Sequence, residues 1–155
     1  MSENVFKIEG NLEEQYIGLL PQIEAIISDE KNAIANMANI AAVLKTQFNW
    51  LWVGFYIVNN DELVVGPYQG PLACTRIKKG RGVCGKSWET ETAILVKDVN
   101  SFPDHIACSS LSRSEIVIPI FKDNAVCAIL DVDSEELNFF TETDLKYLTA
   151  ISALI

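Results

Sequence analysis

Long apolar runs and basic residues are scarce in this sequence. No stretch approaches the 18 consecutive apolar residues that suggest a membrane-spanning helix, although hydrophobic residues make up 49% of the 155 positions. The first ten residues, MSENVFKIEG, also lack the basic segment and apolar stretch of a secretory signal. The sequence therefore predicts a cytoplasmic globular protein without a membrane partner, in which the four cysteines serve as thiols, metal ligands or transient redox groups.

The charge balance argues against nucleic acid as a partner. Twelve Lys and Arg residues stand against 21 Asp and Glu, which gives a formal net charge of −9. A phosphate backbone would be repelled over most of such a surface. No internal repeat or low-complexity tract is visible, and the length fits one domain over residues 1–155 that buries its core without disulfides or metal.

Helices are predicted at both ends of the chain. Apolar periodicity indicates helices over residues 12–28 and 30–47, and Pro21 predicts a break or kink in the first. The predicted apolar stripe of the second helix consists of Ile34, Met37, Ala38, Ala41 and Leu44. Thr141 is the predicted N-cap of a last helix, with Asp144 three residues further on. Its apolar end leaves two alternatives, packing on the N-terminal helices or on the second subunit of a homodimer.

Strands are predicted between these helices. The segment WLWVGFYIV, residues 50–58, is aromatic and β-branched and pairs with residues 62–65. Its predicted helix-facing side chains are Leu51, Val53, Phe55 and Ile57, and the other face carries Trp50, Trp52, Tyr56 and the gap left by Gly54. A second hairpin joins residues 115–122 and 125–133 around Asp123-Asn124. Its predicted aliphatic face consists of Ile116, Ile118, Ile120, Val126, Ala128, Leu130 and Val132.

This order of elements predicts an α+β fold. We expect a central antiparallel sheet with the N- and C-terminal helices on one face. Loops over residues 66–92 and 97–113, with a short helix at 83–89 and short strands at 73–77 and 93–96, would cover the other face. They would enclose a pocket with cysteines in its lid. The predicted lining of this pocket is Trp52, Tyr56, Glu115, Asp131 and Asp133.

The carboxylates of this pocket require a partner. Asp131 and Asp133 lie on one face of a buried strand, where two ionised groups repel each other. Buried charges are rarely left unpaired. A bound cation, such as the ammonium group of a substrate, would resolve the conflict.

Three of the four cysteines, Cys74, Cys84 and Cys108, lie in turn-rich segments of the stretch from Gly66 to Asp133, which also contains the only histidine, His105. Together these four residues form a possible Cys3His zinc site, although only His105 and Cys108 have the close spacing typical of such sites. As a cation, His105 would instead lower the pKa of the Cys108 thiol.

A fourth cysteine and a glycine-rich segment are interpreted as structural features. Cys127 lies in an apolar strand and is typical of a small core residue. The segment from Gly80 to Gly85 matches G-x-G-x-x-G. It either binds a dinucleotide or holds a tight turn, and the short helix after it favours the turn.

Five segments of the chain carry a specific resemblance. GPYQGPLACTRI, GRGVCG, HIAC, SEIV-x-P and LD-x-DS occur in this order. The chain resembles the free methionine-R-sulfoxide reductases, a branch of the GAF-domain family, over nearly its whole length. The resemblance implies a single GAF-like domain in which Cys108 attacks the sulfoxide, Cys74 is the main resolving thiol and Cys84 a second recycling thiol. Ser109 departs from the family pattern, which usually has Asp after the HIAC cysteine.

The resemblance also implies a substrate site and a reaction. Trp52 and Tyr56 are the pocket aromatics, Asp131 holds the substrate ammonium, and Glu115 or Asp133 donates the proton. Attack by Cys108 yields methionine and a sulfenic acid, which condenses to a disulfide that thioredoxin reduces. No metal or organic cofactor is required, and the role would be in oxidative stress. The alternative is a GAF-type module that senses a small molecule or redox state without turnover.

Overall fold

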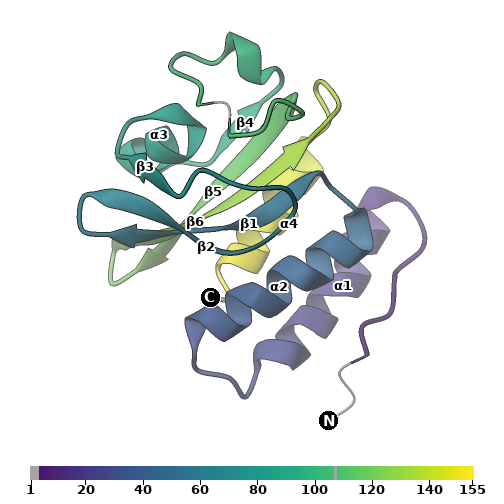
Figure 1. Ribbon diagram of the computed structural model, residues 1–155. Helices are drawn as coiled ribbons and strands as arrows, with labels where there is room; N and C mark the ends of the chain where they lie inside the picture. Colours follow the sequence, from purple (N-terminus) through teal and green to yellow (C-terminus); the bar gives the residue numbers. More distant parts are fainter. Residues whose placement is uncertain (1–3, 107) are drawn as a thin grey trace.

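The fold is built around one antiparallel sheet. The structure, a computed structural model, describes residues 4–106 and 108–155. The sheet has six strands in the order β3-β2-β1-β6-β5-β4 (Figure 1). The strands are β1 (Trp52–Asn59), β2 (Glu62–Gln69), β3 (Arg76–Lys78), β4 (Ile94–Val96), β5 (Ser114–Lys122) and β6 (Ala125–Ser134). The helices are α1 (Leu12–Ile27), α2 (Ala33–Phe48), α3 (Gly82–Thr90) and α4 (Glu142–Ser152), with a 3₁₀ turn at Val99–Ser101.

The two faces of the sheet carry separate apolar clusters. Helices α1, α2 and α4 cover one face, where Leu19, Leu44 and Leu148 pack against β1, β5 and β6. On the other face α3 and the loops pack over a second cluster that contains Trp52, Tyr56 and Cys84. The predicted α+β arrangement, with helices on one face and a loop-covered pocket on the other, is confirmed.

The ends of the chain meet on the helical face. The ring of Tyr16 on α1 stacks on Tyr147 of α4, with centroids 5.1 Å apart. The Tyr16 hydroxyl donates a hydrogen bond of 2.7 Å to Oδ1 of Asp144. Thr141 is the N-cap of α4, as predicted, and its N–H donates to Asp144 Oδ2. Of the two predicted alternatives for this end of the chain, the structure shows packing on the N-terminal helices.

Two predictions about the helical side require correction. Helix α1 runs continuously through Pro21. On α2, Ile34 and Ala38 are exposed, and the buried apolar stripe instead includes Met37, Ile40 and Leu44. None of the described helices is long and apolar enough to cross a membrane.

Strand faces deviate from the predicted alternation at irregular positions. Trp50 stacks on Phe48 on the helical side, and Leu51 packs on the pocket side, because β1 begins only at Trp52. In the second hairpin Ile120 pairs with Ala128, whereas Phe121 pairs with Val126. This register shift leaves Cys127 as an extra residue on β6 and moves Val126 to the pocket-side cluster. Cys127 is half-buried and packs toward the helical side, away from the pocket.

Candidate active site

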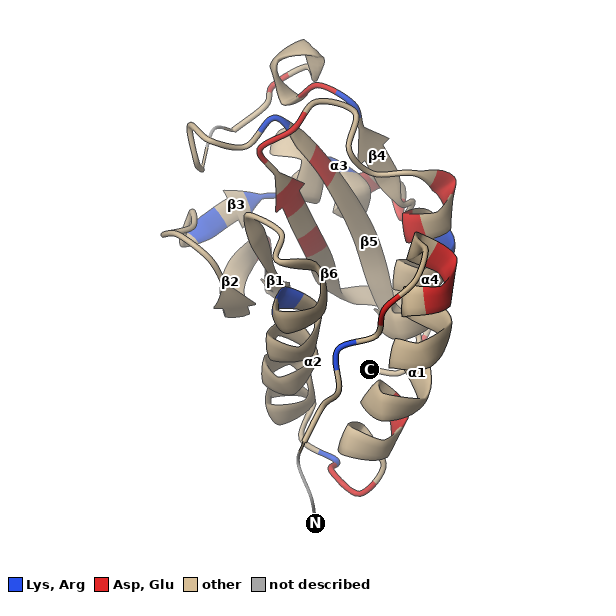
Figure 2. Ribbon diagram, turned by 90° about the vertical axis from the view of Figure 1, so that its right-hand side faces the viewer, with Lys and Arg blue, Asp and Glu red and all other residues tan. Residues whose placement is uncertain are grey.

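The pocket lies on the face of the sheet opposite α1, α2 and α4. All five residues predicted to line it do so, namely Trp52, Tyr56, Glu115, Asp131 and Asp133. Strand register brings them together, because Asp133 pairs with Trp52 on one side and with Glu115 on the other. Figure 2 shows the acidic segments on the neighbouring strands β5 and β6.

Gly54 makes room for the aromatic wall of the pocket. A Cβ atom at this position would lie 2.2 Å from Cβ of Tyr68 and 2.8 Å from the ring of Trp52. With glycine present, Trp52 stacks on Tyr68 at 5.1 Å and on Tyr56 at 5.9 Å between ring centroids. The gap predicted between the aromatic side chains is therefore filled by Tyr68, which the sequence did not single out.

Burial raises the pKa of all three carboxyl groups of the pocket, and the groups differ in protonation state. It raises the pKa of Asp131 to about 6, so that this group is mostly ionised at pH 7. Burial and the charge of Asp131 hold the pKa of Glu115 and of Asp133 well above the usual range. Among the described residues that line the pocket, none is Lys or Arg. The site therefore offers negative charge without a basic side chain to balance it.

Two buried polar atoms in the pocket lack hydrogen bonds. Oδ1 of Asp131 and Nε1 of Trp52 have no hydrogen-bond partner among the described residues. Asp131 is 6% exposed and Trp52 is 4% exposed. Buried polar groups are normally satisfied, so these atoms mark an acceptor and a donor that are suited to a ligand.

Cys74 and Cys108 form a disulfide at this pocket. Their Cα atoms are 5.3 Å apart, although 34 positions separate them in the sequence. Cys108 lines the pocket, and the backbone carbonyl of Cys74 accepts a 3.0 Å hydrogen bond from the Tyr56 hydroxyl. The two loops that carry these cysteines therefore meet over the pocket, as the implied pairing of Cys74 with Cys108 requires.

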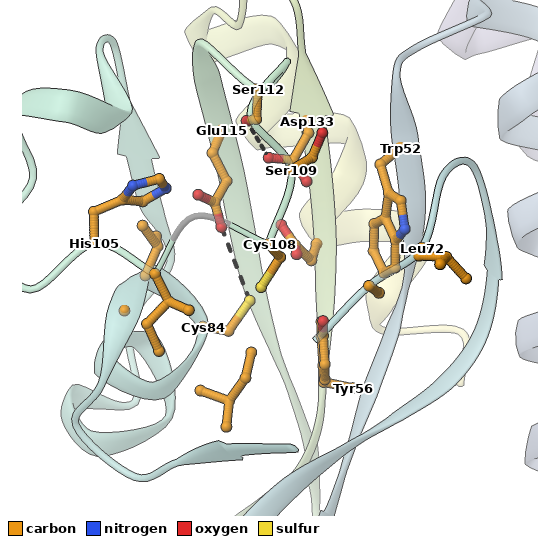
Figure 3. A pocket seen from close by; sticks show the side chains of 16 residues that line it. Trp52, Tyr56, Leu72, Cys84, His105, Cys108, Ser109, Ser112, Glu115 and Asp133 are labelled. Atoms are coloured by element: carbon orange, nitrogen blue, oxygen red, sulfur yellow. Dashed lines mark hydrogen bonds between the residues drawn. The ribbon is translucent and has the colours of Figure 1, made fainter. Parts of the chain in front are cut away.

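Cys84 lines the pocket from the short helix that was predicted over residues 83–89. It is on α3, because helix begins at Gly82, and it is 3% exposed. Its Sγ atom lies 3.9 Å from Oε1 of Glu115, a contact drawn in Figure 3. Burial, together with the charges of Asp131 and Glu115, raises the pKa of the Cys84 thiol well above its ordinary value. This thiol is protonated at neutral pH and is therefore a weak nucleophile.

His105 lines the pocket opposite Trp52 (Figure 3). Burial lowers the pKa of its imidazole, which favours the neutral ring. This weakens the expectation that His105 activates Cys108 as a cation. Ala107, within the HIAC motif, lies outside the described residues.

The two alternative sites considered from the sequence are not supported. The disulfide uses Cys74 and Cys108, so these two residues offer no thiolates to a Cys3His zinc site in this form. The glycine motif forms a tight turn, in which the N–H of Gly80 donates to the carbonyl of Gly85 at 2.8 Å. A Cβ atom on Gly85 would lie 2.4 Å from the carbonyl oxygen of Lys78, so glycine is needed for chain packing.

Ser112 is the site residue that sequence reasoning missed. Its hydroxyl donates a 2.5 Å hydrogen bond to Oδ1 of Asp133. Nothing in the sequence distinguishes it from the other serines in the same loop. Leu72 and Ile106, also missed, contribute apolar surface to the pocket lining.

Comparison with known proteins agrees with this architecture. The GAF domain family model matches residues 29–155. The chain is 56% identical to GAF domain-containing protein A of Dictyostelium discoideum, over 100% of this chain and 99% of that protein. It is 38% identical to the free methionine-R-sulfoxide reductase of Escherichia coli, over 92% of this chain and 87% of that protein.

A solved structure extends the likeness. The free methionine-R-sulfoxide reductase of Neisseria meningitidis, determined in complex with its substrate, superposes with a TM-score of 0.96. It is 51% identical in sequence, and the match covers 98% of this chain and 92% of that one. The chain therefore belongs to the GAF domain family, in the branch that contains the free methionine-R-sulfoxide reductases.

Proposed function

We propose that the protein reduces free L-methionine-R-sulfoxide to methionine, with Cys108 as the nucleophile. The single observation that carries this proposal is the Cys74–Cys108 disulfide, which lies against a pocket whose buried acceptor, Asp131 Oδ1, lacks a partner. The relatives named as reductases support the same activity. A sensor module without turnover would share the pocket but would have no need for a nucleophile together with two resolving cysteines.

Substrate binding follows from charge. Asp131, mostly ionised at pH 7, pairs with the α-ammonium group of the free amino acid. The indole N–H of Trp52 donates to an oxygen of the substrate, and the stacked rings of Trp52 and Tyr56 contact its apolar part. The Cys108 thiolate then attacks the sulfoxide sulfur from the lid.

The departing oxygen requires a proton, and we assign its donor as Glu115. The Ser112 hydroxyl donates to Asp133, which stabilises the ionised form of Asp133. Glu115 accepts only a long 3.9 Å contact from the Cys84 thiol, and burial and the charge of Asp131 hold its pKa well above the usual range, so it keeps a proton at neutral pH. Neighbouring carboxyl groups that burial pushes to different pKa values are typical of an acid and its electrostatic partner.

Turnover then proceeds through the thiols. Proton transfer and attack at sulfur release methionine and leave the Cys108 sulfenic acid. The Cys74 thiol displaces its hydroxyl as water and forms the disulfide. An external dithiol, for which we propose thioredoxin in a reducing cytoplasm, restores both thiols by exchange. The cycle consumes two electrons and needs neither metal nor organic cofactor.

The decisive experiment is turnover of the two epimers of free methionine sulfoxide with thioredoxin, thioredoxin reductase and NADPH. We expect methionine from the R epimer, one NADPH oxidised for each methionine formed. Absence of turnover with either epimer, by protein whose disulfide has been reduced, would reject the enzyme and favour the sensor module.

A further inference from the structure

Three potential metal ligands meet at the wall and floor of the pocket. Cys84 comes from α3, Glu115 from β5 and Asp131 from β6, and their ligand atoms all lie within 4.8 Å of one another. The three residues are 3%, 6% and 6% exposed. Because three elements of regular structure supply them, their positions are fixed by packing of α3 on the sheet. Figure 3 shows Cys84 and Glu115 directed toward each other.

A second observation points to a cation. Oδ1 of Asp131 is buried and accepts no hydrogen bond from any described residue. The described lining of the pocket also provides no Lys or Arg side chain. A buried carboxylate oxygen requires a donor or a positive charge, and for Oδ1 of Asp131 the described residues provide no hydrogen-bond donor and no basic side chain.

We propose that Cys84, Glu115 and Asp131 bind a zinc ion, which blocks the pocket and inhibits the protein. Zn²⁺ would displace the protons of the Cys84 thiol and of Glu115 into solvent. The resulting thiolate and two carboxylates suit this ion, which takes sulfur and oxygen ligands at about 2.3 and 2.0–2.2 Å in a tetrahedral arrangement. Such bond lengths place ligand atoms about 3.3–3.6 Å apart, so the present group needs only small side-chain rotations. The fourth position faces the pocket. Mg²⁺ and Ca²⁺ prefer oxygen ligands and are disfavoured by the thiolate.

The ion would be an inhibitor and not a cofactor of the reaction. It occupies Asp131, the group assigned to the substrate ammonium, and Glu115, the assigned proton donor. Zinc and free methionine sulfoxide should therefore exclude each other. This consequence rests on the proposed function, whereas zinc binding itself does not.

The test uses the oxidised protein, in which the Cys74–Cys108 disulfide leaves Cys84 and Cys127 as the free thiols. The protein is first freed of metal with a chelator, and the chelator is then removed. Binding of ZnCl₂ is measured by calorimetric titration, and binding of CoCl₂ by titration in a spectrophotometer. We expect one equivalent of each ion and a thiolate-to-cobalt charge-transfer band. MgCl₂ at the same concentration should produce neither heat of binding nor displacement of cobalt.

Matched variants locate the site. Cys84→Ser should remove the charge-transfer band and weaken zinc binding by at least about 100-fold, since loss of an outer-sphere partner alone costs about 10- to 100-fold. Cys127→Ser, on the helical side, should leave the band and the affinity unchanged. Asp131→Asn should weaken zinc binding while the thiol of Cys84 remains. This variant tests the site if circular dichroism shows that Cys84→Ser is not folded.

Several outcomes would overturn the proposal. These are the absence of one-equivalent binding, a band that survives Cys84→Ser or is lost in Cys127→Ser, or unchanged affinity in Asp131→Asn. Because the titrations do not measure turnover, a failed reductase assay leaves the zinc result intact. Zinc binding that fails in a protein with normal turnover would reject this inference alone.

Discussion

Sγ of Cys84 lies 3.9 Å from Oε1 of Glu115, and these two residues are 31 positions apart in the sequence. The contact places a buried, protonated thiol beside the proposed acid. Cys84 takes no part in the disulfide formed by Cys74 and Cys108. Each of the three pocket thiols therefore has a distinct environment, and their substitution should give distinct kinetic results.

Substitution of the thiols should separate attack from recycling. Cys108→Ser should abolish methionine formation in a single turnover, because a neutral hydroxyl does not replace a thiolate at sulfur. Cys74→Ser should retain that first turnover and lose steady-state turnover, because the sulfenic acid has no nearby partner. Rapid quench with detection of methionine measures both effects.

The control for this series is Cys127→Ser, which should keep both phases and alter only stability. Reaction of the wild-type protein with one equivalent of substrate should oxidise two thiols and no more. A stoichiometric burst of methionine from Cys108→Ser would refute the assignment of the nucleophile.

Removal of the charge of Asp131 should affect substrate binding first. Charge-assisted hydrogen bonds are worth about 1.5–3 kcal/mol, so Asp131→Asn should raise KM for free methionine sulfoxide by about tenfold or more. The same reasoning predicts poor turnover of methionine sulfoxide inside a peptide, where the nitrogen is an uncharged amide. Equal kcat/KM for free and peptide-bound substrate would contradict the proposed role of the pocket acids.

Stability should depend on pH through Asp131. Its pKa is raised from 3.8 to about 6 in the folded state, so the folded protein binds its proton more tightly than the unfolded chain does. The resulting stability is complete below pH of about 4 and is lost as the pH rises through about 6. Each unit of difference between the folded and unfolded pKa values corresponds to about 1.4 kcal/mol, so the loss of stability is about 3 kcal/mol.

This dependence is measured by urea unfolding of wild-type and Asp131→Asn protein between pH 4 and 8, with the disulfide intact. As the pH rises, the free energy of unfolding of the wild type should fall relative to that of the Asp131→Asn variant. Parallel profiles would show that Asp131 does not titrate in this range.

Recycling should depend on Leu72, whose side chain is 86% exposed and lies two residues before Cys74. A protein reductant that reaches the disulfide must contact this surface. Leu72→Ser should therefore raise KM for thioredoxin by several-fold, whereas any change that arises from the pocket lining should appear equally with the small reductant dithiothreitol. Phe121→Ser is the matched control, since Phe121 is 51% exposed near the end of β5 remote from Glu115. Equal effects of both variants would exclude a docking role for Leu72.

The sequence predicted the sheet and its acidic face well because alternation of side chains is a local property. Glu115, Asp131 and Asp133 lie opposite the aliphatic side chains in their strands, and the Asp123-Asn124 turn that joins the strands has positive φ at both positions. The bulge at Cys127 was not predictable in this way. It depends on the register between two strands, which reverses the face of Val126.

The sequence identified the residues of the site but did not predict how deeply each of them is buried. Motif resemblance identified Cys74, Cys84 and Cys108, yet only the structure separates the lid pair from the buried Cys84. That separation depends on how α3 packs against β5 and β6. Ser112 has no sequence signal, because its role arises only where the end of a loop meets the end of β6.

The disulfide between Cys74 and Cys108 also ties the stability of the fold to its redox state. The bond closes a segment of about 35 residues that contains α3 and β4, and a cross-link of that span lowers the entropy of the unfolded chain by an amount worth about 3–4 kcal/mol. The oxidised protein should resist unfolding and proteolysis better than the reduced one. Under the proposed cycle, the form prepared to bind substrate is then the more fragile form, and oxidation by substrate protects the chain until a reductant arrives.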